Sequence, residues 1–382
     1  MTINGKNFTN DTLVNYSGSV DVQAISADSE TYAGTGVLGI TVASLVNGTI
    51  TKYTQTYTKA ERIKLKVVDS NGKTGTSNII YVGGGTATKI ELTANPQSII
   101  SGQTSFLTAK LEDYYGNVLK NTEIDFSVVK GSGVINISSG TTNANGEVSA
   151  LFSYNLSQPG ISIVQARTAN LSIEIPVRAS VLFVPGTRLT ITATEDPNTK
   201  LTFPADAVTE NIEISISLKV DLDTTTVVEL IDVANSKLLG KIISELVRKF
   251  TANKVSNNLE YGEFEKLVSI EIPYMDSNND GIVDGTQIEV NNLKAARLNE
   301  TTKEWETVND GGINEVDRTK KVVSCDVKHF SYYTIGDFNS ATLTPNPKRG
   351  LETVKPAELH FGDANAVKKK IKELKEKIDN NK

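Results

Sequence analysis

The chain has 382 residues and a formal net charge of −6; aromatic residues make up 6% of it and charged residues 22%. That length suits about three domains, each able to bury its own core. The acidic balance argues against nucleic-acid binding, which needs a basic face, and two histidines leave little for a histidine-based active site. We therefore expect neither an enzyme nor a nucleic-acid partner.

Cysteine content and hydropathy indicate where the protein works. Cys325 is the single cysteine, so no intramolecular disulfide can form, as in many bacterial surface sandwiches. No run of about 18 apolar residues occurs, which predicts no membrane span. Residues 1–10 lack an apolar signal core, although the rest has an extracellular composition. We expect a cell-surface or secreted protein whose chain is a fragment of a longer one or has lost its signal.

Residues 1–83 are expected to form the first of several β-sandwiches in a row. Serine, threonine, asparagine, glycine and valine are plentiful, which favours short strands joined by polar turns. Strands are predicted at 37–42, 63–68 and 76–82. Asp69-Ser-Asn-Gly72 is a turn signal between the last two, and Gly83-Gly-Gly85 is predicted to be a flexible joint.

Residues 86–181 are expected to form the second sandwich. Turn clusters separate six predicted strands, at 89–94, 104–112, 123–129, 146–154, 162–166 and 171–177. Five motifs follow in order: Asp113-Tyr-Tyr-Gly-Asn117, Ile124-Asp-Phe126, Gly131-Ser-Gly133, Thr142-Asn-Ala-Asn-Gly-Glu-Val148 and the stretch 160–166. In this respect the unit resembles the bacterial Ig-like repeats of invasin- and intimin-type adhesins. The resemblance implies a rigid spacer that holds a distal binding tip away from the cell.

Residues 182–340 are expected to form a third sandwich with a helical insertion. Strands are predicted at 212–218, 267–273, 287–290, 293–298, around Trp305 and over 322–335. A helix is predicted from apolar residues spaced three and four apart: Leu238, Leu239, Ile242, Ile243, Leu246, Val247 and Phe250.

Short motifs in this third unit carry a second resemblance. They are Phe203-Pro-Ala-Asp-Ala207, Ile272-Pro-Tyr274, Trp305 and Val327-Lys-His-Phe-Ser-Tyr332. The unit resembles a bacterial surface-protein sandwich that is distantly like the module of ankyrins and netrin receptors.

Residues 341–382 are expected to be a linker containing Pro345-Asn-Pro347, followed by a lysine-rich helical tail. Val367, Ile371, Leu374 and Ile378 are spaced as in a heptad seam. Two heptads are marginal in water, which favours a frayed, solvated helix over a coiled coil.

The clearest chemical motif is Asp276-Ser-Asn-Asn-Asp-Gly-Ile-Val-Asp284. Its spacing matches the start of an EF-hand-like loop, with oxygen ligands for Ca²⁺ at five positions: Asp276, Asn278, Asp280, the Ile282 carbonyl and Asp284. Gln287 stands where such loops carry a bidentate glutamate, which predicts a weak site or one completed by Glu289 or water. The alternative is an acidic, asparagine-rich loop without metal.

A second motif is His329-Phe-Ser331. In the eukaryotic relatives of the third unit, this tripeptide can cleave itself between Phe and Ser, which requires a strained peptide and an activated hydroxyl. The stronger alternative is simple packing on a closing strand. Cys325 alternates with Val323 and Val327, which favours a buried thiol over a reactive one.

The function predicted from these features is that of a non-catalytic spacer of an adhesin-like surface protein, with no catalytic residues. Its partners would be other extracellular modules of the same or a longer chain. One alternative is a module that binds a glycan or a cell-surface protein, with aromatic candidates Trp305, Tyr114, Tyr115, Tyr332 and Tyr333. The other is a module that cleaves itself at Phe330-Ser331.

Overall fold

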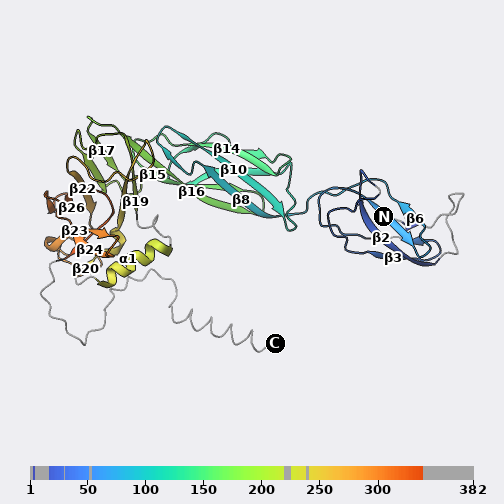
Figure 1. Cartoon of the computed structure of the whole chain (residues 1–382). Helices are drawn as coiled ribbons and strands as arrows, with labels where there is room; N and C mark the ends of the chain where they lie inside the picture. Colours follow the sequence, from blue (N-terminus) through green and yellow to red (C-terminus); the bar gives the residue numbers. More distant parts are fainter. Residues whose placement is uncertain are drawn as a thin grey trace, which may run out of the picture. The chain divides into compact units, whose positions relative to one another are not determined.

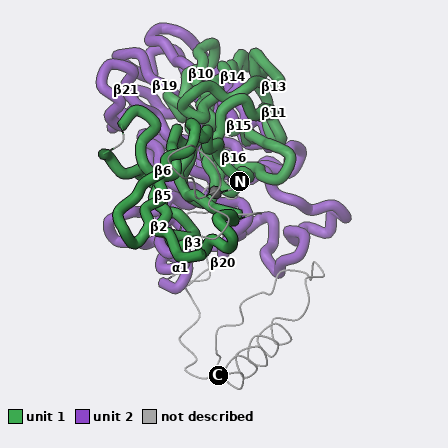
Figure 2. The backbone as a smooth tube through the Cα atoms, turned by 90° about the vertical axis from the view of Figure 1, so that its right-hand side faces the viewer, with its two compact units in different colours: residues 1–156, 161–179 green, residues 157–160, 180–382 purple. Residues whose placement is uncertain are grey.

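The computed structural model describes residues 3–4, 17–29, 31–50, 54–218, 225–237 and 241–338. Within these ranges strands dominate and one short α-helix occurs, so the predicted all-β class is confirmed. The chain divides into two compact units, coloured in Figure 2: unit 1 holds residues 1–156 and 161–179, and unit 2 holds residues 157–160 and 180–382. No described helix is long and apolar enough to cross a membrane.

The first module of unit 1 is a small sheet over a core of its own. Its strands are β1 (Ile3–Asn4), β2 (Gly18–Ser26), β3 (Val42–Leu45), β4 (Thr49–Ile50), β5 (Arg62–Asp69), β6 (Thr74–Thr76) and β7 (Ile80–Tyr81). The main sheet runs β3-β2-β5-β6, and β7 also pairs with β5. Alternation along β2 and β5 turns one face inward, and the buried core residues are Val20, Val22, Ala43, Leu45, Ile63 and Leu65.

The strand predicted at 37–42 is wrong. Leu38 makes only an isolated bridge to Tyr57, and the ladder begins at Val42. Side chains occupy two of the backbone donors, because the Val37 N–H bonds Thr58 Oγ1 and the Ile40 N–H bonds Gln55 Oε1. The Gly39 N–H donates to a main-chain carbonyl, that of Thr56. β-branched composition does not make a strand where no neighbouring strand supplies the ladder.

The second module of unit 1 is a sandwich in which a four-stranded sheet faces the first strands of an 11-stranded sheet (Figure 1). Its strands are β8 (Ala87–Asn95), β9 (Ser98–Ile100), β10 (Thr104–Asp113), β11 (Glu123–Lys130), β12 (Val134–Ile135), β13 (Ser139–Thr141), β14 (Glu147–Ser153), β15 (Gly160–Arg167) and β16 (Ser172–Phe183). One sheet runs β12-β14-β10-β8 and the other β13-β11-β15-β16, with β9 also on β16. Leu107, Leu111 and Phe152 face Ile124, Phe126 and Val164 in one core. The six predicted strands are confirmed to within a residue or two at most ends.

Unit 2 is a larger sandwich. Its elements are β17 (Leu189–Thr192), β18 (Lys200–Phe203), β19 (Ile212–Leu218), α1 (Thr225–Lys237), β20 (Lys241–Ile242), η2 (Ser244–Leu246), β21 (Arg248–Lys254), β22 (Val268–Pro273), η3 (Val290–Asn292), β23 (Leu293–Asn299), β24 (Glu304–Thr307), β25 (Asn314–Asp317), β26 (Val322–Val327) and β27 (Tyr332–Asp337). One sheet runs β17-β18-β22-β26-β25. The other runs β19-β21-β27-β23-β24 and starts on the end of β16, whose Val181 pairs with Ile214.

The predicted helical insertion exists but lies elsewhere in the sequence. The helix is α1, at Thr225–Lys237, and it packs Ile231 and Ala234 beside Trp305. The stretch from 241 to 250, predicted to be helical, forms β20, η2 and the start of β21. β21 pairs with β19 over seven residues, from Ile212↔Lys254 to Leu218↔Arg248. Sheet pairing therefore overrode an apolar spacing that also suits a helix.

The remaining predicted elements are a strand at 287–290 and a C-terminal helix. The strand predicted at 287–290 is wrong, because only a single bridge between Ile282 and Glu289 precedes η3. The predicted C-terminal helix, with Val367, Ile371, Leu374 and Ile378, lies outside the described residues.

Candidate functional site

The predicted calcium loop connects β22 to η3 in unit 2. Asp276 is buried, and its Oδ2 accepts the Gly281 N–H at 3.2 Å. Asp280 Oδ1 accepts the Ile282 N–H at 2.8 Å, and Asp280 Oδ2 accepts Asn278 Nδ2 at 2.8 Å. Gly281 has a φ of 84°, which glycine adopts without strain. The structure thus brings Asp276, Asn278 and Asp280 into one curled half-loop.

Asp284, the last predicted ligand, is engaged differently. Its Oδ2 accepts the Ser277 hydroxyl at 2.6 Å, and the Ser277 N–H also donates to the carboxylate at 3.1 Å. These hydrogen bonds lower the pKa of Asp284 below its ordinary value. Within the described ranges, no group of three or more acidic, histidine or cysteine side chains is gathered closely enough to hold a metal. Closing a metal site would therefore require Asp284 to leave Ser277.

One oxygen of this loop is unsatisfied. Asp276 is only 5% exposed, and its Oδ1 is the one buried side-chain nitrogen or oxygen, among the described residues, with no hydrogen-bond partner. A buried polar atom without a partner costs free energy, and more so on an ionised group. Such an atom is rare in folded proteins and calls for a physical explanation.

Two basic residues lie beside the loop, and sequence reasoning missed both. The Lys321 ammonium donates to the main-chain carbonyl of Asp276, and Arg318 Nη1 reaches Asn291 Oδ1 at 3.5 Å. The pairing of β22 with β26 brings them here, since Pro273 lies opposite Val322. More than forty residues of chain separate Asp276 from Arg318. Only the strand pairing therefore indicates that the two basic residues lie near the loop.

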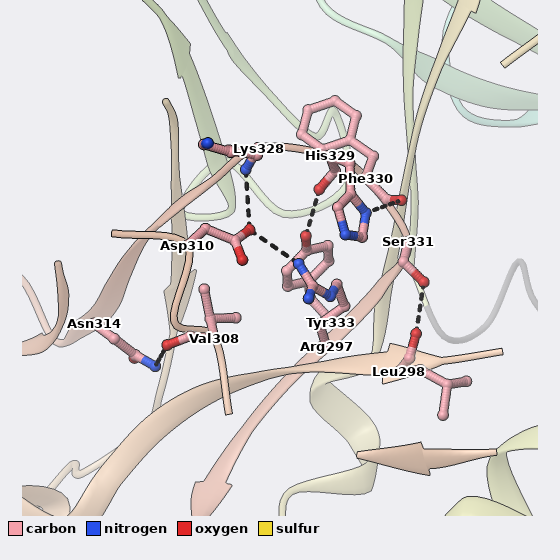
Figure 3. Close-up of polar contacts among 10 residues, drawn as sticks. All are labelled: Arg297, Leu298, Val308, Asp310, Asn314, Lys328, His329, Phe330, Ser331 and Tyr333. Atoms are coloured by element: carbon pink, nitrogen blue, oxygen red, sulfur yellow. Dashed lines mark hydrogen bonds and ion pairs between the residues drawn. The ribbon is translucent and has the colours of Figure 1, made fainter. Parts of the chain in front are cut away.

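The His-Phe-Ser motif forms a corner between β26 and β27, drawn in Figure 3. The Ser331 hydroxyl donates to the Leu298 carbonyl at 3.0 Å and lies 3.2 Å from Glu300 Oε1. His329 Nδ1 lies 3.3 Å from the Phe330 carbonyl oxygen instead. Figure 3 shows the hydroxyl pointing away from the histidine ring. The arrangement does not pair the histidine with the hydroxyl that it would have to activate.

Packing accounts for the other features of this corner. Phe330 is buried among aromatic rings, with centroids 4.8 Å from Phe264 and 5.7 Å from Phe250. The Tyr333 hydroxyl donates back to the His329 carbonyl at 2.6 Å, as tyrosine corners do in other sandwiches. These contacts describe a closed structural corner.

A partly buried ion pair and a buried thiol lie near the corner. Asp310 accepts from Arg297 Nη1 at 2.9 Å and from the Lys328 N–H at 3.0 Å. Cys325 is fully buried, as predicted, and desolvation raises the pKa of its thiol far above the ordinary value. The thiol is therefore protonated at neutral pH and is poorly suited to act as a nucleophile or metal ligand.

The aromatic candidates for sugar binding are mostly packed inside. Trp305, Tyr332 and Tyr333 are all buried, and Trp305 Nε1 donates to Asn235 Oδ1 on α1 at 2.8 Å. Tyr114 and Tyr115 are exposed, with their rings edge to face at 5.2 Å. Of these five aromatic residues, only Tyr114 and Tyr115 therefore have exposed rings on which a sugar could stack.

That turn is held by a second buried aspartate. Asp113 Oδ1 accepts the N–H groups of Tyr115 and Asn117, and its Oδ2 accepts the Gly85 N–H and Asn117 Nδ2. Asn117 also bonds the first module, accepting the Ala60 N–H at 2.8 Å and donating to the Thr58 carbonyl at 2.9 Å. The joint predicted to be flexible is thus bonded at Gly85. The motif itself was visible in the sequence, but its reach to the first module was not.

Comparison with known proteins adds little beyond the fold. No protein-family model and no curated protein matches the chain. A structure of the D0-D1 domain of Intimin is 20% identical, covers 44% of this chain and 83% of its own, and has a TM-score of 0.22. Domains 4 and 5 of the S-layer protein SbsC are 14% identical, cover 46% of this chain and 78% of their own, and have a TM-score of 0.22.

An enzyme also shows partial likeness. The β-glucuronidase of Parabacteroides merdae is 12% identical, and the match covers 42% of this chain, 21% of that enzyme, with a TM-score of 0.21. With TM-scores this low, none of these likenesses carries functional weight.

Proposed function

We propose that this chain is a non-catalytic spacer segment of a bacterial cell-surface or secreted protein. The observation that supports it most is how the second module uses the motifs that resemble adhesin repeats. Asp113 and Asn117 hold a turn and bond the preceding module. Ile124 and Phe126 lie in the core. A motif set that serves turns, joints and core suits a spacer rather than a binding or catalytic surface.

The glycines of these motifs serve close packing. A Cβ on Gly131 would lie 2.1 Å from the Ile161 carbonyl oxygen, and one on Gly133 would lie 2.4 Å from the Phe152 ring. Both have positive φ, at 80° and 129°. Only glycine fits there, so these positions are explained by folding alone.

The threonine and asparagine of the fourth motif have the same kind of role. Thr142 Oγ1 donates to the Leu119 carbonyl and accepts the Thr122 N–H, which closes a crossing between two loops. Asn143 Oδ1 accepts the N–H groups of Asn145 and Glu147 within its own turn. These side chains are occupied by the backbone and leave no polar cluster turned toward a ligand.

Separate cores also suit a spacer. The two modules of unit 1 have distinct buried clusters, around Leu65 and around Leu107, and unit 2 has its own around Phe250. A serial array of closed cores resists pulling one module at a time, since each must unfold before its chain can extend.

Stretching single molecules of the full chain between two handles tests this proposal. We expect discrete unfolding events, with an increment of about 300 Å when the second module extends. In parallel, the chain coupled to beads should show no saturable binding to glycan arrays or host cells. Gradual extension without discrete events, or saturable binding lost in a Tyr114→Ala variant, would contradict the spacer assignment.

The intact mass of the purified chain distinguishes a spacer from a module that cleaves itself. The purified chain should arrive as one species at 41.2 kDa, and Ser331→Ala should have the same length. If the wild type yields two fragments cut after Phe330 and the Ser331→Ala variant stays intact, self-cleavage replaces the spacer proposal.

A further inference from the structure

We propose that the loop of residues 276–284 binds one calcium ion. The ligands are the side-chain oxygens of Asp276, Asn278, Asp280 and Asp284 and the main-chain carbonyl of Ile282. The inference goes beyond the spacer function and does not depend on it.

The unsatisfied oxygen of Asp276 is the observation that points to a ligand. Its partner oxygen, Oδ2, accepts the Gly281 N–H, so the carboxylate faces across the curled loop. Oδ1 is buried with no partner, on a side chain that is 5% exposed. A cation in the loop would satisfy this oxygen without any other change in the buried part of the site.

The neighbouring basic side chains do not satisfy it. Lys321 is bonded to the main-chain carbonyl of Asp276, and Arg318 is directed at Asn291. Three loop aspartates outnumber these two cations, so the loop retains a negative charge that attracts a divalent ion. The two cations also compete with that ion and weaken its binding.

The donor set selects calcium over other metals. Every ligand is a carboxylate, amide or carbonyl oxygen. Zinc and copper prefer nitrogen and sulfur ligands, so this set does not suit them. Ca²⁺ accepts six to eight oxygens in flexible geometry, whereas Mg²⁺ demands a near-ideal octahedron and gives up its waters reluctantly. Asn278, Asp280 and Asp284 are exposed, so their side chains can rotate onto an ion with little repacking.

Binding of the ion requires two side chains of the loop to give up the hydrogen bonds that they make in this structure. Asp284 gives up the hydroxyl of Ser277, and Asp280 gives up Asn278 Nδ2. Gln287, exposed at the position of the usual bidentate glutamate, supplies at most a single neutral oxygen. Affinity in the millimolar range follows, which suits extracellular calcium levels.

Calcium binding must stabilise unit 2, because an ion that binds only the folded loop shifts the folding equilibrium by the factor 1 + [L]/Kd. At ten times Kd this is about elevenfold, which corresponds to a rise in Tm of about 3 °C. Trp305 is the single tryptophan and lies buried in unit 2, so its fluorescence reports on this unit.

The experiment follows Trp305 fluorescence during melting of the full chain in chelator, in CaCl₂ and in MgCl₂, with calorimetric titration of CaCl₂ beside it. We expect calcium to raise Tm and magnesium to raise it less. Asp276→Asn should abolish the calcium shift while remaining folded in chelator, and Glu263→Gln, an exposed charge outside the loop, should retain it. Gln287→Glu should lower the calcium Kd about tenfold by restoring the bidentate ligand.

Three results would overturn the proposal. One is an unchanged wild-type Tm with no heat of binding in several millimolar CaCl₂. Another is an equal shift with MgCl₂, which indicates general charge screening. The third is a calcium shift that survives in Asp276→Asn, which places the ion elsewhere.

Discussion

Two buried aspartates, Asp113 in unit 1 and Asp276 in unit 2, each begin a turn but have different surroundings. Asp113 is 6% exposed and accepts four hydrogen bonds, from Gly85, Tyr115 and Asn117. Asp276 is 5% exposed and accepts one side-chain hydrogen bond, from Gly281. Two carboxylates that are almost equally buried therefore differ in their hydrogen bonding: one completes a turn, and the other keeps an oxygen without a partner.

The largest effect is expected when the satisfied carboxylate is removed. Asp113→Ala leaves three main-chain N–H groups and an amide without their acceptor, which should destabilise unit 1 by about 3 kcal/mol. Urea unfolding of the full chain by circular dichroism measures this, and the Trp305 transition of unit 2 should not move. Asp125→Ala, an exposed aspartate on β11, is the control and should cost less than about 0.5 kcal/mol. Equal losses in both variants would show that the hydrogen bonds to the buried Asp113 carboxylate do not set the cost.

Lowering the pH should also reveal how strongly the hydrogen bonds to Asp113 stabilise unit 1. Burial opposes ionisation of Asp113, but the hydrogen bonds from Asn117, Gly85 and Tyr115 outweigh it and hold its pKa below the ordinary value. The stabilisation is therefore fully present above the unfolded pKa of about 3.9 and is lost as the pH falls through the lower folded pKa.

Asp113→Asn lacks this titration and should lose less stability between pH 6 and pH 3 than the wild type. The denaturation midpoint of unit 1 at the two pH values checks it. Parallel losses in both proteins would assign the acid sensitivity to other carboxylates.

A smaller effect should follow at the joint that Asp113 supports. Asn117→Ala removes the bonds to Ala60 and Thr58 and should reduce protection of the Ala60 amide by about 1 kcal/mol in hydrogen exchange. Asn145→Ala, in an exposed turn of the same module, should leave that amide unchanged. Unaltered Ala60 exchange in Asn117→Ala would show that the two modules are not coupled through this residue.

The smallest effect is expected for the unsatisfied carboxylate. In chelator, Asp276→Asn should change the stability of unit 2 by less than about 1 kcal/mol, because one bond to Gly281 can be kept while an unpaired charged oxygen is removed. Asp113→Asn should cost more, since an amide nitrogen cannot accept the N–H groups that Asp113 holds. Chemical denaturation of both variants compares them directly, and a larger loss at Asp276 would reverse the distinction.

Prediction from sequence succeeded where local pattern and tertiary pairing agree. β19 was predicted to the residue, because its apolar and polar residues alternate, and β23 to within one; both have neighbouring strands on each side. The helix was misplaced because Ile242, Ile243 and Leu246 have helical spacing although they lie in β20, the turn after it and η2, and because the partners of β21 lie far away in the sequence. At the candidate site, the ligand types and spacing were visible, but Lys321, Arg318 and the orphaned oxygen were not.

The sequence by itself determined the all-β class, the turn residues and the oxygen-rich spacing of the 276–284 loop, since these depend on residues close together in the chain. Tertiary structure decided which distant groups reach each aspartate. Gly85 donates to the Asp113 carboxylate across 28 residues and adds to the local bonds from Tyr115 and Asn117, whereas Lys321, 45 residues from Asp276, reaches only its main-chain carbonyl. Strand pairing brings these distant groups to the turns, and a linear pattern carries no record of them.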